Sequence, residues 1–253
     1  MGTITFQNVS KVYRGPKDVR ALDDISLTVG EGEFVALLGP SGCGKSTLLN
    51  VLAGFEQITD GKLLFDGSAV KRPGPDRGVV FQEAALFPWL NVWQNVIFGP
   101  QVQGLARADY EARARELLDL VGLSSFAESL PVQLSGGMRQ RVGIARVLAM
   151  NPRALLMDEP FGALDAQTRL SMQQLLLDVW QALGTTVLFV THDIDEAILL
   201  SDRICVMSAH PGRIVRTIPI ALPRPRSISS LTSPEFVAYK AQIMADIEVS
   251  HKH

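Results

Sequence analysis

The sequence has 253 residues, of which 47% are hydrophobic and 20% are charged, and its formal net charge is −2. This length is enough to bury a sizeable core, in one large domain or in a domain with a subdomain. No run of Lys or Arg stands out, so nucleic acid is not an expected partner.

Cysteine usage and hydropathy set two further expectations. The two cysteines, Cys43 and Cys205, make no disulfide framework and suit a reducing, cytosolic compartment. No signal-peptide pattern begins the chain, and no apolar run reaches the roughly 18 residues that a membrane span requires. If a membrane is involved, we expect another chain to span it.

The first elements in chain order are two strands. Residues 4–9 and 21–29 alternate between apolar and polar side chains, which predicts a β-rich N-terminal layer. Tyr13 lies between them in a polar segment. Its ring can stack on a nucleotide base, or it can cover the sheet as a surface tyrosine, and the pattern leaves both interpretations open.

Residues 39–47 fit the pattern G-x-x-x-x-G-K-[ST] between a strand-like run at 34–38 and a helix-like run at 46–52. This context predicts a phosphate-binding loop at a helix N-terminus, with Lys45 at the terminal phosphates and Ser46 as a Mg²⁺ ligand. The residues expected to surround the nucleotide are Gly39, Pro40, Ser41, Gly42, Cys43, Gly44, Lys45, Ser46 and Thr47.

The next stretch contains a turn at residues 59–61, a strand at 62–65, and a strand at 77–81 that ends in Gln82. Gln82 can orient water or ligate Mg²⁺ from that position. Residues 84–93 are unusually aromatic, and Pro88 should keep them out of regular structure. They are either a surface for partner docking or a small local core.

Two predicted helices follow. Apolar residues at helical spacing over 109–121 favour an amphipathic helix within a helical subdomain. The segment 134–141 opens another helix, with Ser135 as the N-cap. Gly136 and Gly137 destabilise a helix start unless something approaches the backbone closely, so we expect this helix to be a second phosphate-binding N-terminus.

The next buried strand is predicted at residues 154–157, and two acidic residues follow it. Asp158 is expected to hold Mg²⁺ through water, and Glu159 to act as the general base toward the attacking water. A helix is predicted from 167 to 183, and a buried strand at 186–190 leads to His192. A lone His is usually structural, but this position favours a contact with the γ-phosphate.

These motifs together resemble the ATP-binding subunit of an ABC transporter, and the resemblance spans nearly the whole chain. The motifs that carry it are residues 39–47, Gln82, residues 134–138, residues 155–159, residues 163–165 and His192. The resemblance implies an α/β fold, with a P-loop NTPase (RecA-like) core, a β-rich N-terminal subdomain and an inserted helical subdomain at about 88–150. The ATPase domain would cover 1–233, and a C-terminal helical tail 234–253.

The resemblance also implies partners and cofactors. ATP and Mg²⁺ would be the cofactors, and Asp165 would join the nucleotide-binding residues. Two copies would form a head-to-tail homodimer in which Ser135 and Gly137 contact ATP held by Lys45 of the other copy. The dimer would bind two copies of a transmembrane permease at the cytoplasmic face of the inner membrane, and a solute-binding protein would act indirectly.

Several short segments are similar to ATPases of nitrate, sulfonate and taurine importers, with taurine the first expectation. These segments are residues 53–55, 78–82, 86–89, 136–141, 211–214, 222–226 and 233–236. Met138 stands where Gln is common in the family. Two other classes remain: a soluble ABC ATPase acting on nucleic acid or ribosomes, and a P-loop kinase. A protein of the first class would be expected to carry a coiled-coil insertion, a second cassette or basic patches, and this sequence shows none of them. A P-loop kinase does not need the helix start at residues 135–137, so these residues argue against a kinase.

Overall fold

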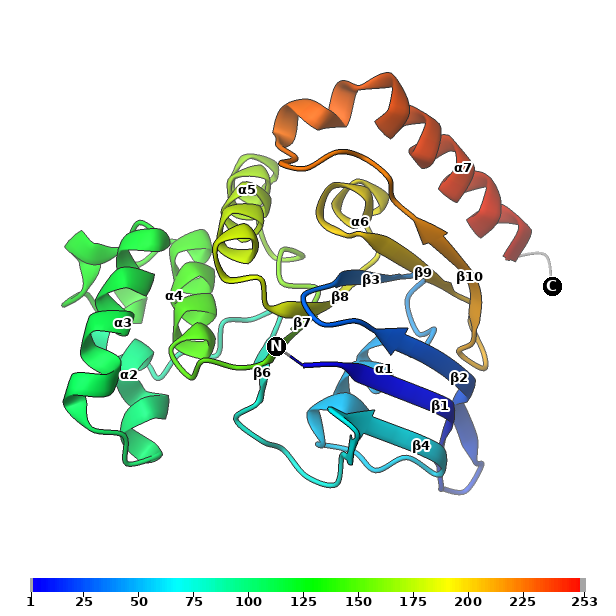
Figure 1. The fold of residues 1–253 in the computed structure, drawn as a ribbon, viewed down its shortest axis with the longest axis horizontal. Helices are drawn as coiled ribbons and strands as arrows, with labels where there is room; N and C mark the ends of the chain where they lie inside the picture. Colours follow the sequence, from blue (N-terminus) through cyan, green and yellow to red (C-terminus); the bar gives the residue numbers. More distant parts are fainter. Residues whose placement is uncertain (1, 251–253) are drawn as a thin grey trace.

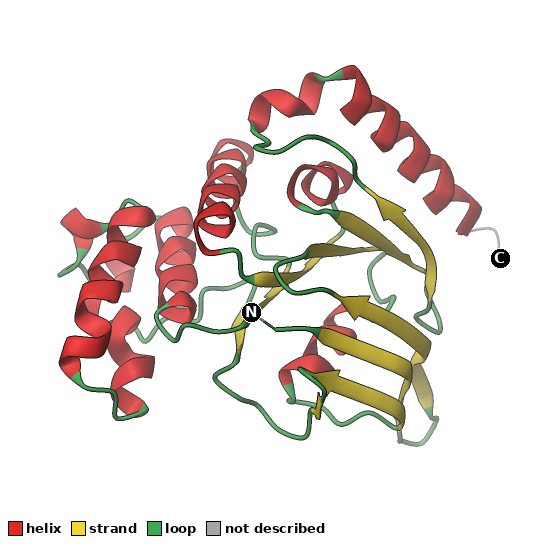
Figure 2. Ribbon diagram, viewed as in Figure 1, coloured by secondary structure: helices red, strands yellow, loops and turns green. Residues whose placement is uncertain are grey.

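The computed structural model describes residues 2–250 and contains two sheets with helices around them (Figures 1 and 2). The smaller, antiparallel sheet has the order β2-β1-β4-β5. Its strands are β1 (Ile4–Tyr13), β2 (Val19–Val29), β4 (Asp60–Phe65) and β5 (Ser68–Ala69). Alternate residues of β1 and β2 are buried, which matches the alternation predicted for the N-terminal layer.

The larger sheet has the order β10-β9-β3-β8-β7-β6, and all neighbouring pairs are parallel except β10 with β9. Its strands are β3 (Phe34–Leu38), β6 (Arg77–Val80), β7 (Ala154–Asp158), β8 (Thr186–Thr191), β9 (Arg203–Met207) and β10 (Ile214–Pro219). Every residue of β3 and β8 is buried, as expected for central parallel strands covered on both faces. The carboxyl ends of β3, β7 and β8 therefore meet at one edge.

The helices occupy three places (Figure 1). Helix α1 packs between the two sheets, and α2, α3 and α4 cluster at one end of the molecule. Helices α5, α6 and α7 lie on the opposite face of the larger sheet from α1. The bounds are α1 (Lys45–Ala53), α2 (Val92–Val102), α3 (Arg107–Leu120), α4 (Gly136–Leu148), α5 (Ala166–Leu183), α6 (Ile194–Leu200) and α7 (Pro234–Ser250), with 3-10 turns at Ser124–Phe126, Pro131–Gln133 and Ile228–Thr232. Among the described residues, no helix has the length and apolar character to cross a membrane.

Two local predictions differ from the structure. Gly61 is not in a turn but inside β4, where its φ is 88° and a Cβ would lie 2.2 Å from the carbonyl oxygen of Asn8. The register of β1 and β4 shifts beside Asn8, so Gly61 permits a bulge. The irregular segment after Pro88 also ends earlier than predicted, because Asn91 and Gln94 form a capping box that starts α2 at Val92.

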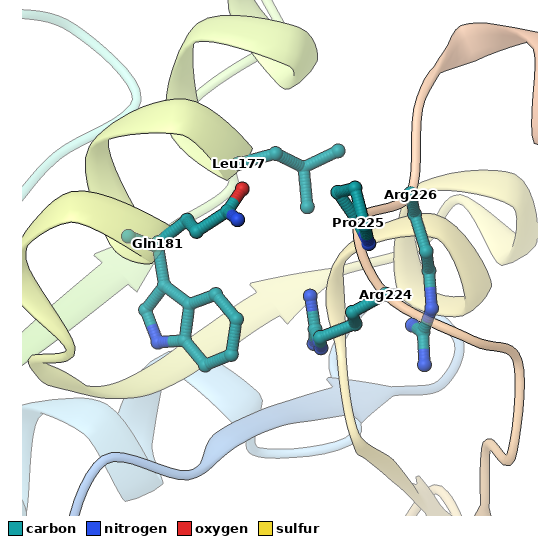
Figure 3. A pocket seen from close by; sticks show the side chains of 6 residues that line it. Leu177, Gln181, Arg224, Pro225 and Arg226 are labelled. Atoms are coloured by element: carbon teal, nitrogen blue, oxygen red, sulfur yellow. The ribbon is translucent and has the colours of Figure 1, made fainter.

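The C-terminal segment wraps around α5 and α6. The side chains of Phe236 and Ile243 in α7 are buried in the same hydrophobic cluster as α5 and α6. Ahead of α7, Arg224 and Arg226 lie beside α5 and border a cavity of about 130 Å³ (Figure 3). The tail predicted at 234–253 is thus helical to residue 250 and packs on the core, while residues 251–253 lie outside the described part.

Candidate active site

The loop at residues 39–47 has a backbone that only glycine tolerates at two points. Gly42 and Gly44 have φ angles of 79° and 93°. A Cβ on Gly44 would also lie 2.8 Å from the carbonyl oxygen of Ala21. Lys45 is 4% exposed, and its ammonium group donates to the carbonyls of Gly39 at 2.7 Å and Pro40 at 2.9 Å. The loop therefore holds a buried cation at the N-terminus of α1.

Ser46 and Asp158 come together from α1 and β7. The Ser46 hydroxyl donates to the Asp158 carboxylate over 3.1 Å. Burial raises the pKa of Asp158, and the charge of Glu159 acts in the same direction, while the Ser46 hydrogen bond and the Lys45 charge oppose them. A hydroxyl and a carboxylate are the hard oxygen ligands that suit Mg²⁺, so this pair fits a site for that ion.

Glu159 and His192 form a second pair. Glu159 Oε2 lies 2.9 Å from His192 Nδ1. The backbone of Glu159 has a φ of 45°, which is rare for a residue other than glycine. The Glu159 N–H donates to the carbonyl of Val190 over 3.0 Å. The β7 and β8 strand ends thus hold the carboxylate and the imidazole together.

One cavity of about 230 Å³ joins the P-loop to Glu159. Its lining consists of Val19, Arg20, Ala21, Ser41, Gly42, Gly44, Lys45, Ser46, Thr47, Glu159 and His210. Tyr13 does not line it but pairs with Val19 across the strands, and Lys11 Nζ lies 4.7 Å from the centre of the Tyr13 ring. The Tyr13 residue is 38% exposed.

Gln82 is exposed and lies beside the turn that follows Glu159 rather than in the cavity lining. A Cβ added to Gly162 would meet Gln82 Nε2 at 2.9 Å, and the Gly162 N–H donates to the Glu159 carbonyl over 3.1 Å. The structure therefore brings Gln82 close to the backbone of the Glu159 turn.

The helix starts at Ser135 and Asp165 lie outside the cavity lining. Ser135 is the N-cap of α4, as predicted, and accepts from the Met138 N–H at 3.2 Å. Asp165 caps α5 in the same way through the Thr168 N–H at 3.0 Å, and the hydrogen bonds from Thr168 lower the pKa of Asp165.

The two glycines after Ser135 have different environments. A Cβ on Gly137 would lie 2.4 Å from the Thr168 methyl group, so close packing of α4 on α5 within one chain requires this glycine. The sequence alone explains both glycines by the close approach of a phosphate and does not predict the packing of Gly137 against Thr168. Gly136 is exposed, and a Cβ there would meet no atom closer than 3.9 Å.

Sequence reasoning also missed Glu196, in α6. This carboxylate is 5% exposed and accepts from the Thr191 hydroxyl at 2.7 Å and from the Gln173 amide at 3.2 Å. Burial raises the pKa of Glu196. The contact fixes the strand end that carries His192, and only tertiary structure brings these residues together.

The fold and the P-loop geometry define a P-loop nucleotide hydrolase. The model of the family described as ABC transporter matches residues 22–162. The chain therefore belongs to the ABC transporter family, as an ATP-hydrolysing, ATP-binding subunit. This confirms the family predicted from the motifs.

Individual relatives support the assignment to this family. A putative ATP-binding protein of Brucella abortus (strain 2308) is 51% identical over 240 residues, which are 95% of this chain and 91% of that protein. The taurine import ATP-binding protein TauB of Burkholderia pseudomallei (strain 1710b) is 54% identical over 216 residues, 85% of this chain and 83% of that protein. The ATP-binding cassette MJ0796, solved as a dimer in a post-hydrolysis state bound to ADP and Pi, matches with a TM-score of 0.75 at 35% identity over 87% of this chain and 100% of that chain.

Substitution of Glu159 by Gln tests the predicted role of Glu159 as the general base. Gln keeps the shape and the contact with His192 but lacks a basic oxygen, so Glu159→Gln should bind ATP normally and lose steady-state phosphate release by about 100-fold or more. The variant should accumulate as an ATP-held dimer in size-exclusion chromatography. Turnover near the wild-type rate would remove Glu159 from the role of base.

Proposed function

We propose that this chain is the ATP-hydrolysing subunit of a bacterial ABC importer for a small anionic or zwitterionic solute. The observation that carries the proposal is a cavity lined by both the P-loop and Glu159, in which the lining residue Ser46 is also hydrogen-bonded to Asp158. Taurine or another sulfonate is the first candidate solute and nitrate the second. The similarity to taurine import ATP-binding proteins supports this order.

In the proposed reaction, the P-loop N–H groups and Lys45 bind the phosphates of ATP. Ser46, Asp158 and Gln82 would hold Mg²⁺, which would neutralise phosphate charge. Glu159 accepts a proton from the attacking water. His192 contacts the γ-phosphate, and its contact at 2.9 Å also keeps the Glu159 carboxylate in place. Tyr13 stacks on the base at the margin of the cavity.

The second half of the site comes from another copy of the chain. Ser135, Gly136 and Gly137 start a helix outside the cavity of their own chain, so they suit a phosphate that the P-loop of a partner holds. Asp165 caps the neighbouring helix at the same surface. The solved dimer of the MJ0796 cassette supports a homodimer of this kind.

The proposed assembly has two further components. Two copies of a membrane-spanning permease would bind the dimer at the cytoplasmic face of the inner membrane, and a solute-binding protein would deliver the solute to them. In this scheme residues 1–233 form the ATPase domain, with the helical subdomain at about 88–150, and the tail begins at 234.

A groove lined by aromatic, aliphatic and polar side chains in the helical subdomain supports the permease contact. The groove encloses about 500 Å³ and is lined by Trp89, Leu90, Trp93, Gln94, Ile97, Phe98, Gln101, Arg107 and Tyr110. Phe87 packs beneath it, with ring centroids 4.4 Å from Phe98 and 5.7 Å from Trp89. We propose that a short cytoplasmic helix of the permease binds here. The segment begins only a few residues after Gln82, so the γ-phosphate region has a short covalent route to the groove.

Solute binding by the partner solute-binding protein tests the transport proposal, because the ATPase itself does not contact the solute. We expect that protein to bind taurine or an alkanesulfonate more tightly than nitrate, measured by calorimetry. The same solute should raise ATP hydrolysis by the reconstituted transporter. Copurification with DNA or ribosomes instead of a permease would contradict the importer assignment.

Paired substitutions in one dimer test the shared site. In a dimer of a Ser135→Arg chain with a Lys45→Ala chain, one site combines wild-type Lys45 with wild-type Ser135, so we expect hydrolysis at up to about half the wild-type rate. In a dimer of a wild-type chain with a chain that carries both substitutions, both shared sites are damaged, and we expect almost no hydrolysis. Differently tagged chains allow each dimer to be purified and its phosphate release measured. The reverse pattern would place each site within one chain.

Truncation of Trp89 tests the groove. The Trp89 side chain is 73% exposed, so Trp89→Ala should leave the melting temperature of the isolated subunit nearly unchanged. Aromatic anchors at interface centres often contribute about 2 kcal/mol or more, so pull-down of the permease should weaken more than tenfold. Val102→Ala is the matched control, because Val102 is 71% exposed on α2 but does not line the groove. A destabilised Trp89→Ala subunit that still assembles normally would instead support a local core.

A further inference from the structure

The loop between β9 and β10, residues 208–213, packs directly on the P-loop. A Cβ on Gly212 would lie 2.2 Å from the carbonyl oxygen of Cys43, and a Cβ on Gly39 would lie 2.7 Å from the carbonyl oxygen of Met207. Glycine on both sides thus lets the two backbones touch. A segment about 170 residues away in the sequence therefore becomes part of the wall around the phosphate loop.

Several hydrogen bonds fix this 208–213 loop in place. The Gly212 N–H donates to the Ala21 carbonyl over 3.1 Å, and the Asp23 N–H donates to the Gly212 carbonyl over 3.0 Å. Arg213 Nε donates to Asp23 Oδ2 over 2.8 Å. Hydrogen bonds from Arg213 and then Arg20 lower the pKa of Asp23, which keeps this carboxylate ionised at neutral pH. The loop is tied to the start of β2, which lines the same cavity.

His210 lies at the tip of the loop and lines the cavity. Its φ of 47° is in the left-handed region, which is uncommon outside glycine, although His is among the residues enriched there. The imidazole Nε2 and Cε1 lie 3.9 Å and 3.8 Å from the position of a Cβ on Gly42. This uncommon backbone conformation and the position of the ring in the cavity wall, next to the phosphate loop, together point to a role for the His210 side chain.

We infer that His210 is a further nucleotide-binding residue, whose imidazole donates a hydrogen bond to a β- or γ-phosphate oxygen of a nucleoside di- or triphosphate. This inference rests on the proposed nucleotide site. Its position beside Gly42 places the ring at the phosphate loop rather than at Tyr13, where the base is expected. An imidazole N–H is a suitable donor to an anionic oxygen and would add to the donors of the P-loop.

Glycine at position 210 provides a clean test. His210→Gly removes the imidazole and relieves the left-handed backbone, so the melting temperature should not fall. Calorimetry in the Glu159→Gln background avoids hydrolysis during the titration. We expect Kd for MgATP and MgADP to rise about tenfold, as for a lost charge-assisted hydrogen bond, and Kd for AMP to change less than twofold. Ala209→Gly, at the neighbouring exposed position, is the matched control and should leave all three values unchanged.

Three outcomes would overturn the inference. The first is unchanged affinity of His210→Gly for ATP and ADP. The second is an equal loss for AMP, ADP and ATP, which would place the ring at the nucleoside or the α-phosphate. The third is the same loss in Ala209→Gly, which would assign the effect to loop flexibility. Lys45→Ala separates this from a failure of the proposed site: if Lys45→Ala binds ATP as well as the unsubstituted chain, the nucleotide site itself is wrong.

Discussion

The parallel pairing of β3, β7 and β8 is the constraint on which the site depends. Leu38 of β3 is in register with Thr191 of β8, and Asp158 of β7 is in register with Val190. The three strands therefore end at the same edge of the sheet. The P-loop, Glu159 and His192 follow within one or two residues of these strand ends. A shift of one residue in any pair would turn the following side chain to the other face of the sheet. Complete burial of the central strands opposes such a shift.

The sequence predicts the parts of this arrangement that are local. The P-loop, the acidic end of β7 and the N-cap at Ser135 each depend on residues within about ten positions, where turn chemistry and burial pattern are informative. His210 and Glu196 could not be predicted, because their neighbours come from distant parts of the chain. The structural need for glycine at position 137 could not be predicted either, because only the packing of α4 on α5 reveals it.

The position of His192 depends in turn on α6, a helix of seven residues that is held at both ends. At its start, Lys240 Nζ donates to Asp195 over 2.8 Å. At its end, Arg226 is 4% exposed and burial lowers its pKa to about 10. Its guanidinium donates to the carbonyls of Ile198, Leu199, Ser201, Ile220 and Leu222. A cation at a helix C-terminus also complements the helix dipole, so the C-terminal segment stabilises the helix that directly follows His192.

The same logic of helix ends supports the proposal that a second chain completes the site. Ser135 Oγ satisfies the Met138 N–H, and the first helical backbone bond runs from Arg139 to the Ser135 carbonyl. The N–H groups of Gly136 and Gly137 precede that bond and have no acceptor within the helix. Close packing on Thr168 fixes the buried Gly137, while Gly136 is exposed, so the helix start is held in place with Gly136 at the surface. Since Ser135, Gly136 and Gly137 do not line the cavity of their own chain, this helix start suits the proposed contact with an anion that another copy holds.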